Sequence, residues 1–297
     1  MKVLVYGAGG SQQFPVINAL KNKGAQVVAT THQPEKVETL RNAGVEPVIA
    51  DMADRERLNE ITKGIDAISF LVPFFLANPM DGLGYAKNAI DAAVKNQVQL
   101  LVWNTSGFIL PVKIGNPSMD VRIDVLEYLK GSGLPYIIIQ PSGYAENLLG
   151  PWTAPFVKSE QTVTYPTPEE MPVGWIATKD VAAFVAEAIY SPHLAGQSFQ
   201  VSGIENLNGQ QLAEKFSIGL NKKIQYRQMP PKDFGKILDG LFGVGAGKGA
   251  EAMYQEITDT KNYPSMHAAS MTDVLEKLPV KMTSIETWVA QNNQSFN

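Results

Sequence analysis

The chain has 297 residues, of which 44% are hydrophobic and 18% are charged, so it can bury a large core and has the composition of a globular protein. Its formal net charge of −4 argues against nucleic acid or an anionic membrane as a partner. There is no cysteine, and His32, His193 and His267 lie far apart, so we expect no disulfide, cysteine nucleophile or histidine-based metal centre.

Charged or strongly polar residues interrupt every apolar run well before about 18 residues, so no transmembrane helix is expected. The start, Met1-Lys2-Val3-Leu4, lacks an apolar segment followed by a small-residue cleavage site. We therefore expect a cytoplasmic protein.

The first twenty residues predict a strand, a glycine turn and a helix. Residues 2–5 favour a strand, and an apolar-periodic run covers residues 14–20. Between them, Gly7 permits a tight turn, while Gly9 and Gly10 keep side chains away from an approaching pyrophosphate. The N–H groups at the start of the helix would then face that anion. The alternative is a glycine turn that merely joins a strand to a helix.

A second strand is expected at residues 26–30, followed by a break and a short helix over residues 35–41. An acidic residue at the end of this strand would hold the 2′-hydroxyl of NAD, whereas a basic one suits the 2′-phosphate of NADP. Neither Asp nor Glu stands there, and His32 and Lys36 are close by. The sequence therefore favours NADP(H) over NAD(H), although His32 could equally be a solvent-facing turn residue.

A third strand over residues 44–51 ends in an aspartate, and a helix follows from Asp54. Asp51 could accept a hydrogen bond from the adenine amino group, or it could simply turn the chain. A fourth, nearly continuous apolar strand is expected at residues 65–72.

Pro73 ends the fourth strand, and Phe74 follows at its carboxyl end, where ligands bind in open α/β sheets. This aromatic side chain lines a ligand cleft or belongs to the core. A fifth strand at residues 100–103 ends in Asn104-Thr105-Ser106-Gly107, whose polar groups could bind a ribose or a substrate carbonyl or could be ordinary turn formers.

A helix at residues 119–130 and a sixth strand at residues 134–140 continue the alternation, which predicts an α/β fold with a doubly wound parallel Rossmann sheet. Prolines interrupt the next segment, which we expect to be irregular. We assign residues 1–141 to a dinucleotide-binding domain, to which residues 179–203 return. Residues 142–178 and 204–297 are assigned to a smaller substrate-binding part.

The C-terminal third contains several local signals. Asn208 is expected to open a helix that runs to residue 220. The glycine-rich residues 234–249 predict a helix end and a mobile loop over the cleft, with a low-complexity linker as the alternative. Residues 283–286 have capping-box spacing, and the tail after Gln291 is expected to fray.

These residues together resemble the NmrA-like group of atypical short-chain dehydrogenases. The opening pattern of that family is a strand followed by Gly-Ala-Thr-Gly-x-Gln-Gly, and this chain has Gly7-Ala8-Gly9-Gly10-Ser11-Gln12-Gln13. The resemblance continues with Asp51-Met52, with Gly131 to Tyr136, with Gln140-Pro141 and Tyr144 to Asn147, and with Asp180-Val181-Ala182.

The resemblance implies that NAD(P) binds at Gly7, Gly10 and Gln12, with the adenine near Asp51 and Met52. Candidate substrate contacts are Phe74, Tyr144, Asn147 and Trp152. The full expected cofactor site comprises Gly7, Gly9, Gly10, Ser11, Gln12, Gln13, His32, Asp51, Met52, Val72, Pro73, Asn104 and Thr105.

The chain departs from the family pattern at three points. Gln13 replaces the third glycine, so the phosphate grip is altered or supplemented by a side-chain amide. His32 occupies the frequently basic position after the second strand, which leaves the choice of cofactor open. None of the ten tyrosines is followed by a lysine four residues later, so the usual Tyr-x-x-x-Lys pair is missing.

Arg122 and Tyr144 are the candidate catalytic residues. Arg122 could hold the nicotinamide ribose as the missing lysine would, but it stays charged and cannot act as an acid near neutral pH. It could instead be a surface helix residue.

Two functions are compatible with these features. The first is an NAD(P)H-dependent reductase of a small quinone-like or carbonyl compound, because hydrogen-bond donors can stabilise a reduced quinone without a dedicated tyrosine acid. The second is a non-catalytic redox sensor that binds NAD(P) and acts through a protein partner. A homodimer is a further possibility for either function.

Overall fold

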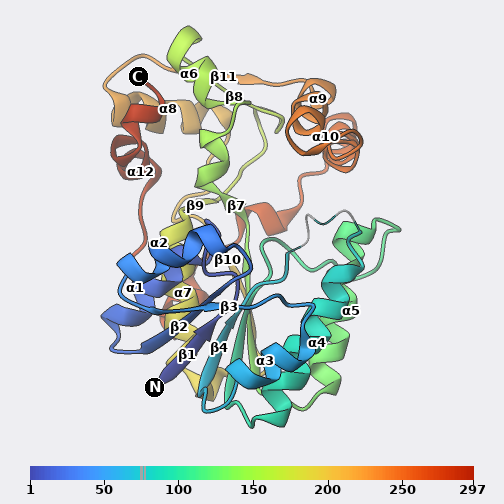
Figure 1. Cartoon of the computed structure of the whole chain (residues 1–297). Helices are drawn as coiled ribbons and strands as arrows, with labels where there is room; N and C mark the ends of the chain where they lie inside the picture. Colours follow the sequence, from blue (N-terminus) through green and yellow to red (C-terminus); the bar gives the residue numbers. More distant parts are fainter. Residues whose placement is uncertain (74–75, 77) are drawn as a thin grey trace. The chain divides into compact units, whose positions relative to one another are not determined.

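The computed structural model describes residues 1–73, 76 and 78–297 of the chain (Figure 1). They form two compact units. The larger unit comprises residues 1–141, 178–200 and 273–280, and the smaller unit comprises the remaining segments, 142–177, 201–272 and 281–297. Residues 273–280, which the sequence-based boundaries placed in the smaller part, pack with the larger unit.

The larger unit is built on a seven-stranded sheet in the order β10-β6-β5-β4-β1-β2-β3. Val3 of β1 pairs in parallel with Val27 of β2 on one side and with Ala67 of β4 on the other. The chain order therefore reverses at β1, as in a doubly wound fold. The strands are β1 (Lys2–Val5), β2 (Gln26–Thr31), β3 (Glu46–Ile49), β4 (Ala67–Phe70), β5 (Leu100–Asn104), β6 (Tyr136–Pro141) and β10 (Ser198–Val201).

Helices cover both faces of this sheet, which confirms the predicted α/β class (Figure 1). α1 packs against α7, while α3, α4 and α5 pack in succession on the other face. β4 and β5 are buried along their whole length, which explains their continuous apolar sequence. The elements are α1 (Phe14–Asn22), η1 (Pro34–Lys36), α2 (Val37–Asn42), α3 (Arg55–Ile61), α4 (Asp81–Lys95), α5 (Pro117–Gly131), α7 (Thr178–Ile189), η3 (Pro192–Leu194) and α11 (Thr272–Lys277).

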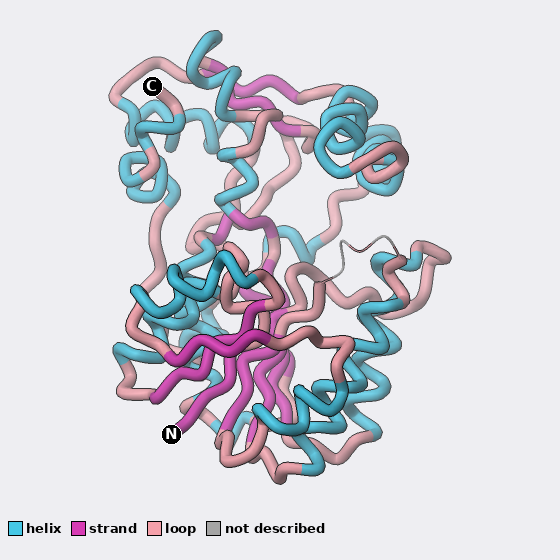
Figure 2. The backbone as a smooth tube through the Cα atoms, in the orientation of Figure 1, coloured by secondary structure: helices cyan, strands magenta, loops and turns pink. Residues whose placement is uncertain are grey.

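The smaller unit contains two short parallel strand pairs, β11 with β8 and β7 with β9, and several helices (Figure 2). The prediction that residues 142–178 are irregular is wrong, because the prolines there lie at helix starts and in turns between short elements. The elements are β7 (Gly143–Tyr144), η2 (Ala145–Leu149), α6 (Ala154–Glu160), β8 (Thr162–Tyr165), β9 (Trp175–Ile176), α8 (Gly209–Leu220), β11 (Gln225–Gln228), α9 (Pro231–Phe242), α10 (Lys248–Thr260), η4 (Ser265–Ala268), α12 (Ile285–Gln291) and η5 (Asn293–Ser295).

The glycine-rich residues 234–249 contain the expected helix end, because α9 ends at Phe242 and a turn at residues 243–247 leads into α10. The mobility of this turn and its place over a cleft remain predictions. An Oδ1 atom of Asp239 accepts hydrogen bonds from the N–H groups of Gly245 (3.0 Å) and Gly247 (2.8 Å), which orders the turn. A Cβ atom on Gly247 would lie 2.0 Å from the carbonyl oxygen of Gly235. The glycines therefore allow two helices to approach closely.

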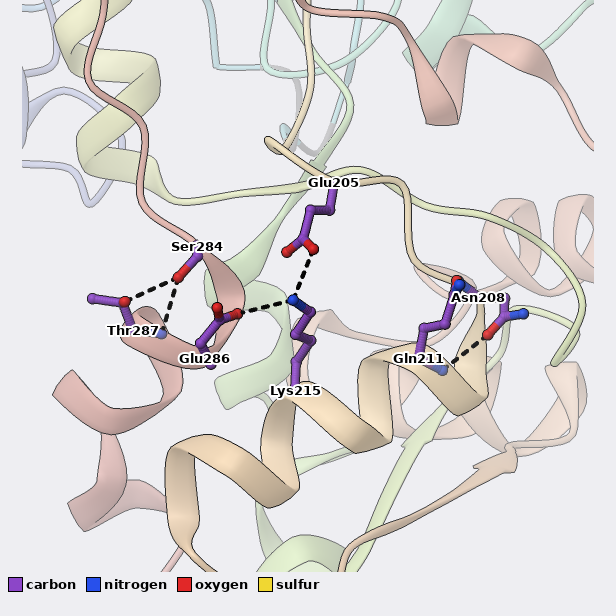
Figure 3. Close-up of polar contacts among 7 residues, drawn as sticks. All are labelled: Glu205, Asn208, Gln211, Lys215, Ser284, Glu286 and Thr287. Carbon is purple, nitrogen blue, oxygen red and sulfur yellow. Dashed lines mark hydrogen bonds and ion pairs between the residues drawn. The ribbon is translucent and has the colours of Figure 1, made fainter.

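Caps and ion pairs organise α8 and α12 (Figure 3). Asn208 and Gln211 form a reciprocal capping box at the start of α8, which confirms the predicted helix start. Ser284 caps α12 by accepting from the N–H of Thr287, so the cap lies one residue later than the expected box that began at residue 283. The carboxylate of Glu286 instead faces Lys215, at 3.4 Å.

The C-terminal tail is ordered by aromatic packing, so the expected fraying is wrong. The side chain of Phe296 is 1% exposed. Its ring lies 5.1 Å from that of Phe216 and 6.2 Å from that of Trp288. Three aromatic residues from different segments close this part of the core.

Candidate functional site

The glycine turn, residues 7–13, lies at the carboxyl end of β1, where the strand order reverses. Gly7 has a φ of +64°, so it occupies the left-handed region that favours glycine. Its N–H donates to Oγ1 of Thr30 (3.1 Å), and the N–H of Ala8 donates to the carbonyl of Thr30 (2.8 Å). The end of β2 thus holds the start of the turn.

The other two glycines are required by the packing of the protein itself. A Cβ atom on Gly9 would lie 3.1 Å from Oγ1 of Thr31 and 3.3 Å from Cβ of Lys36. A Cβ atom on Gly10 would lie 3.3 Å from the carbonyl oxygen of Gly7. The turn therefore presents backbone instead of side chains, as a phosphate site requires.

Hydrogen bonds within the turn leave two donors available. The N–H of Gly10 donates to Gly7 (2.9 Å), and the N–H groups of Gln13 and Phe14 donate to Gly10 (3.2 and 2.9 Å). Within the part of the chain that the structure describes, the N–H groups of Gly9 and Ser11 have no hydrogen-bond acceptor. Unpaired N–H groups before a helix N-terminus favour an anion.

The two glutamines of the turn are engaged inside the protein. Gln13 is 1% exposed, and its Oε1 accepts from the hydroxyl of Ser69 on β4 at 3.0 Å. Nε2 of Gln12 donates to the hydroxyl of Ser106 at 2.8 Å. The amide that was expected to supplement the phosphate grip at Gln13 is thus already bonded to β4.

Lys36 is the basic residue that the structure brings to the turn. His32 is exposed just after β2, whereas the aliphatic stem of Lys36 lies beside Gly9. Lys36 reaches this place because η1 folds the chain back after β2. Lys36 stands near the predicted site in the sequence but is not among the predicted site residues, because the sequence alone does not show that η1 folds the chain back toward the turn.

Asp51 and Met52 follow β3 with local roles. Oδ1 of Asp51 accepts from the N–H of Ala53 at 2.8 Å, which is the chain-turning alternative for this aspartate. Met52 is half-buried and packs against the core of the larger unit. Their expected position near the adenine remains a prediction.

The carboxyl ends of β4 and β5 differ. Val72 is a core residue with 1% exposure and Pro73 is half-buried, while Phe74 lies outside the described residues. Asn104 and Thr105 are fully buried, and both act as turn formers. Asn104 accepts from the N–H of Ser106 (2.9 Å), and the hydroxyl of Thr105 donates to the carbonyl of Gly107 (2.5 Å).

Arg122 is buried, with 6% exposure, so the alternative of a surface helix residue is wrong. Its Nε donates to the carbonyl of Thr105 at 3.0 Å, and its Nη1 lies 3.7 Å from the sulfur of Met119. The guanidinium therefore supports the turn that follows β5. A helical position alone does not reveal this, because its partner, Thr105, belongs to the turn after β5 and not to the helix.

In the smaller unit, the structure brings two expected substrate residues together. The indole N–H of Trp152 donates to the carbonyl of Asn147 (2.7 Å), and its ring packs edge-on against Phe234 at 5.1 Å. The ring of Phe234 lies 5.9 Å from Tyr165 and 5.6 Å from Tyr254. We call Trp152, Tyr165, Trp175, Phe234 and Tyr254 the aromatic cluster.

The hydroxyls of the aromatic cluster are poor acids. Burial raises the pKa of Tyr165, although hydrogen bonds to Tyr254 and Asn147 oppose that rise. Burial also raises the pKa of Tyr254 well above its usual value. Tyr144 is separately buried at the end of β7, with 8% exposure. Apart from Trp152, which lies in the turn before α6, sequence reasoning missed the cluster. Its other members come from β8, β9, α9 and α10.

Within the described ranges, no group of three or more His, Asp or Glu side chains is placed to hold a metal ion. In the same ranges, no helix combines the length and apolar character that a membrane span requires.

Two curated relatives are similar to this chain. An NAD(P)H azoreductase from Xenophilus azovorans is 25% identical over 227 residues, covering 75% of this chain and 76% of the relative. The photosystem II assembly factor Ycf39 from Cyanophora paradoxa is 25% identical over 235 residues, covering 75% of this chain and 71% of the relative.

Solved structures share the fold. A triphenylmethane reductase from Citrobacter sp. in complex with NADP(H) has a TM-score of 0.79 at 17% identity, covering 97% of this chain and 99% of that one. An Escherichia coli NADPH-dependent quinone oxidoreductase with NADPH has a TM-score of 0.79 at 19% identity, covering 98% and 99%. NmrA, a negative transcriptional regulator, in complex with NAD has a TM-score of 0.75 at 16% identity, covering 98% and 94%.

A family model also matches the chain. The NmrA-like family matches residues 1–289, which is nearly the whole chain. The seven-stranded sheet and the order of its strands agree with that match. The chain belongs to the NmrA-like family.

Proposed function

We propose that the chain binds NADP(H) at the glycine turn and is an NAD(P)H-dependent reductase of a small quinone-like or carbonyl compound. The observation that carries the proposal is the turn itself, where a left-handed Gly7 and the unpaired N–H groups of Gly9 and Ser11 precede the start of α1. Two linked phosphates carry the charge and the acceptor oxygens that such a turn recognises.

The choice of NADP(H) rests on Lys36. Its stem contacts the position of Gly9, so its ammonium group is tethered next to the turn. The ammonium group would attract the 2′-phosphate that distinguishes NADP(H) from NAD(H). No carboxylate stands at the end of β2 to repel that phosphate.

The bound cofactor would supply the hydride. The residues of this chain would hold the dinucleotide, position the acceptor and stabilise developing negative charge. Arg122 supports the turn after β5 through Thr105, which suits a positioning role better than proton transfer. Without a Tyr-x-x-x-Lys pair, an acceptor that tolerates reduction without a strong protein acid is favoured, and a quinone is such an acceptor.

The names of similar proteins support the same chemistry. They include an azoreductase, a triphenylmethane reductase and a quinone oxidoreductase, and a quinone is among the acceptors proposed for this chain. Tyr144, Asn147 and Trp152 are the proposed substrate contacts in the smaller unit, and Phe74 is proposed in the larger one.

The test is the oxidation of NADPH, followed at its absorbance band, on addition of simple quinones, an azo dye and aldehydes. The proposal expects turnover with at least one quinone and slower turnover with NADH. Binding of NADPH without turnover on any acceptor would contradict the reductase function and leave dinucleotide binding intact.

The second candidate is a redox sensor that binds the dinucleotide without consuming it. The missing Tyr-x-x-x-Lys pair and the structural engagement of Arg122 favour it, and NmrA is a regulator with the same fold. A sensor would bind reduced and oxidised dinucleotides with different affinities, would turn over no acceptor and would co-purify with a protein whose release depends on the dinucleotide.

A further inference from the structure

Two adjacent side chains tie the glycine turn to the two strands beyond β1. Gln12 reaches Ser106 after β5, and Gln13 reaches Ser69 on β4. These contacts span 94 and 56 residues of sequence, so they join segments that lie far apart along the chain.

Both serines are held in place by further hydrogen bonds. Ser69 is fully buried, and its carbonyl accepts from the N–H of Tyr6 at 3.1 Å. Ser106 has a φ of +53°, and its N–H is bonded to Asn104 at 2.9 Å. The next residue back, Thr105, is held by Arg122 and by the carbonyl of Ile139. Both hydroxyls are therefore fixed points.

The start of α1 has a proline in its first turn but no side-chain cap. Gln13 occupies the N-cap position with helical dihedral angles, and it makes no side-chain capping hydrogen bond. Its amide points to β4 instead, where it is buried. The helix start therefore depends on contacts to neighbouring strands and not on a local cap.

We propose that Gln12 and Gln13 form a clamp that fixes the phosphate-binding turn, and that they act on dinucleotide affinity through the backbone of the turn without touching the cofactor. This inference rests on the proposed dinucleotide binding and changes the role that the family resemblance implied for Gln12. The clamp holds the N–H groups of Gly9 and Ser11 in one arrangement, so that binding does not have to order them.

The test is a double-mutant cycle on NADPH affinity, measured by calorimetry with the full-length protein. Gln12→Met keeps the size of the side chain and removes the amide, and Ser106→Ala removes the hydroxyl. Each single change is expected to raise the Kd about fivefold, and the double variant is expected to be no weaker than the weaker-binding single variant. Gln99→Met, at an exposed glutamine before β5, is the matched control and leaves the Kd unchanged.

A second cycle with Gln13→Met and Ser69→Ala probes the buried half of the clamp, with thermal unfolding measured in parallel. A purely structural role would lower the Tm and leave the Kd unchanged at temperatures well below unfolding. That result in both cycles would overturn the clamp. An unchanged Kd for Ser106→Ala beside a raised Kd for Gln12→Met would also overturn it, because Gln12 would then touch the cofactor directly.

The wild-type titration separates the clamp from the proposed function. If the wild type binds neither NADPH nor NADH, the proposed function fails and the clamp fails with it. If the wild type binds and the variants bind equally well, only the clamp fails.

Discussion

The glycine turn of the larger unit and the aromatic cluster of the smaller unit are built in opposite ways. The turn is one continuous stretch, residues 7–13, and its backbone N–H groups are the proposed ligands of the phosphates. Its sequence pattern is therefore local. The cluster gathers Trp152, Tyr165, Trp175, Phe234 and Tyr254 from segments up to about a hundred residues apart. Backbone sites can be recognised from short motifs, whereas side-chain clusters depend on tertiary packing.

The comparison predicts that the cluster carries stability and the turn carries ligand affinity. Phe234 is 5% exposed, so Phe234→Ala removes a buried ring and lowers the free energy of unfolding by about 3 kcal/mol. Phe242→Ala, at a residue on the same helix that is 67% exposed, is the control and should change stability by less than about 0.5 kcal/mol. Denaturant unfolding measures both. If Phe234→Ala were fully folded under the assay conditions but bound NADPH more weakly than the wild type, this assignment of stability to the cluster and affinity to the turn would be wrong.

A half-buried histidine, His267, gives the smaller unit a pH response. Burial lowers the pKa of His267 from 6.5 to about 4. Because the folded pKa lies below the unfolded one, the unfolded state takes up the proton first, and stability present above pH 6.5 falls as the pH drops toward 4. The loss reaches about 3 kcal/mol at full protonation.

Unfolding of His267→Gln at several pH values checks this response. The variant should show a shallower loss of stability between pH 6.5 and 4, while His193→Gln, at an exposed histidine of the larger unit, should keep the wild-type slope. Equal slopes for wild type and His267→Gln would contradict the assignment.

A substitution in the turn should reduce the affinity for NADPH more than it reduces the stability of the protein. Gly9→Val places a branched side chain against Thr31 and Lys36 and is expected to weaken NADPH binding at least about 30-fold, which is about 2 kcal/mol. Gly84→Ala, at an exposed glycine of α4 with no atom within 4 Å of the added Cβ, is the control. Calorimetric titration of both variants decides. Unimpaired binding by Gly9→Val would remove the turn from the site.

The smallest effect concerns cofactor preference. Lys36→Gln removes the cation beside the turn, so the Kd for NADPH should rise about tenfold while the Kd for NADH stays the same. Lys63→Gln, at an exposed lysine after α3, should alter neither value. A higher ionic strength should reduce the ratio of the Kd for NADH to the Kd for NADPH in the wild type, because salt screens the charge of Lys36. The same ratio should not change in Lys36→Gln. Equal losses for both cofactors would show that Lys36 does not recognise the 2′-phosphate.

Local signals were sufficient for much of the fold. The positive φ of Gly7 and the caps at Asp54 and Asn208 follow from short-range chemistry, and the structure has all three. The alternation of strands and helices likewise predicted the doubly wound sheet, because each strand and helix has its own periodicity.

The remaining features required tertiary information. Gln13 occupies a glycine position of the family pattern, and only the neighbouring β4 strand explains where its amide goes. The sequence left open whether Arg122 holds a ribose or lies on the surface, because its partner, Thr105, belongs to the turn after β5. The polar tail was expected to fray, but Phe296 packs against Phe216, and this contact cannot be recognised from the local sequence. In each case a long-range contact outweighed local propensity.

The central claim is that residues 7–13 hold the diphosphate of a dinucleotide. Calorimetric titration of the wild type and of Gly9→Val with NADPH, and then with NADH, tests it most directly. The account predicts one saturable site, tighter for NADPH than for NADH, that is lost in Gly9→Val. Absence of binding to either dinucleotide, or equal binding by the wild type and the variant, would contradict it.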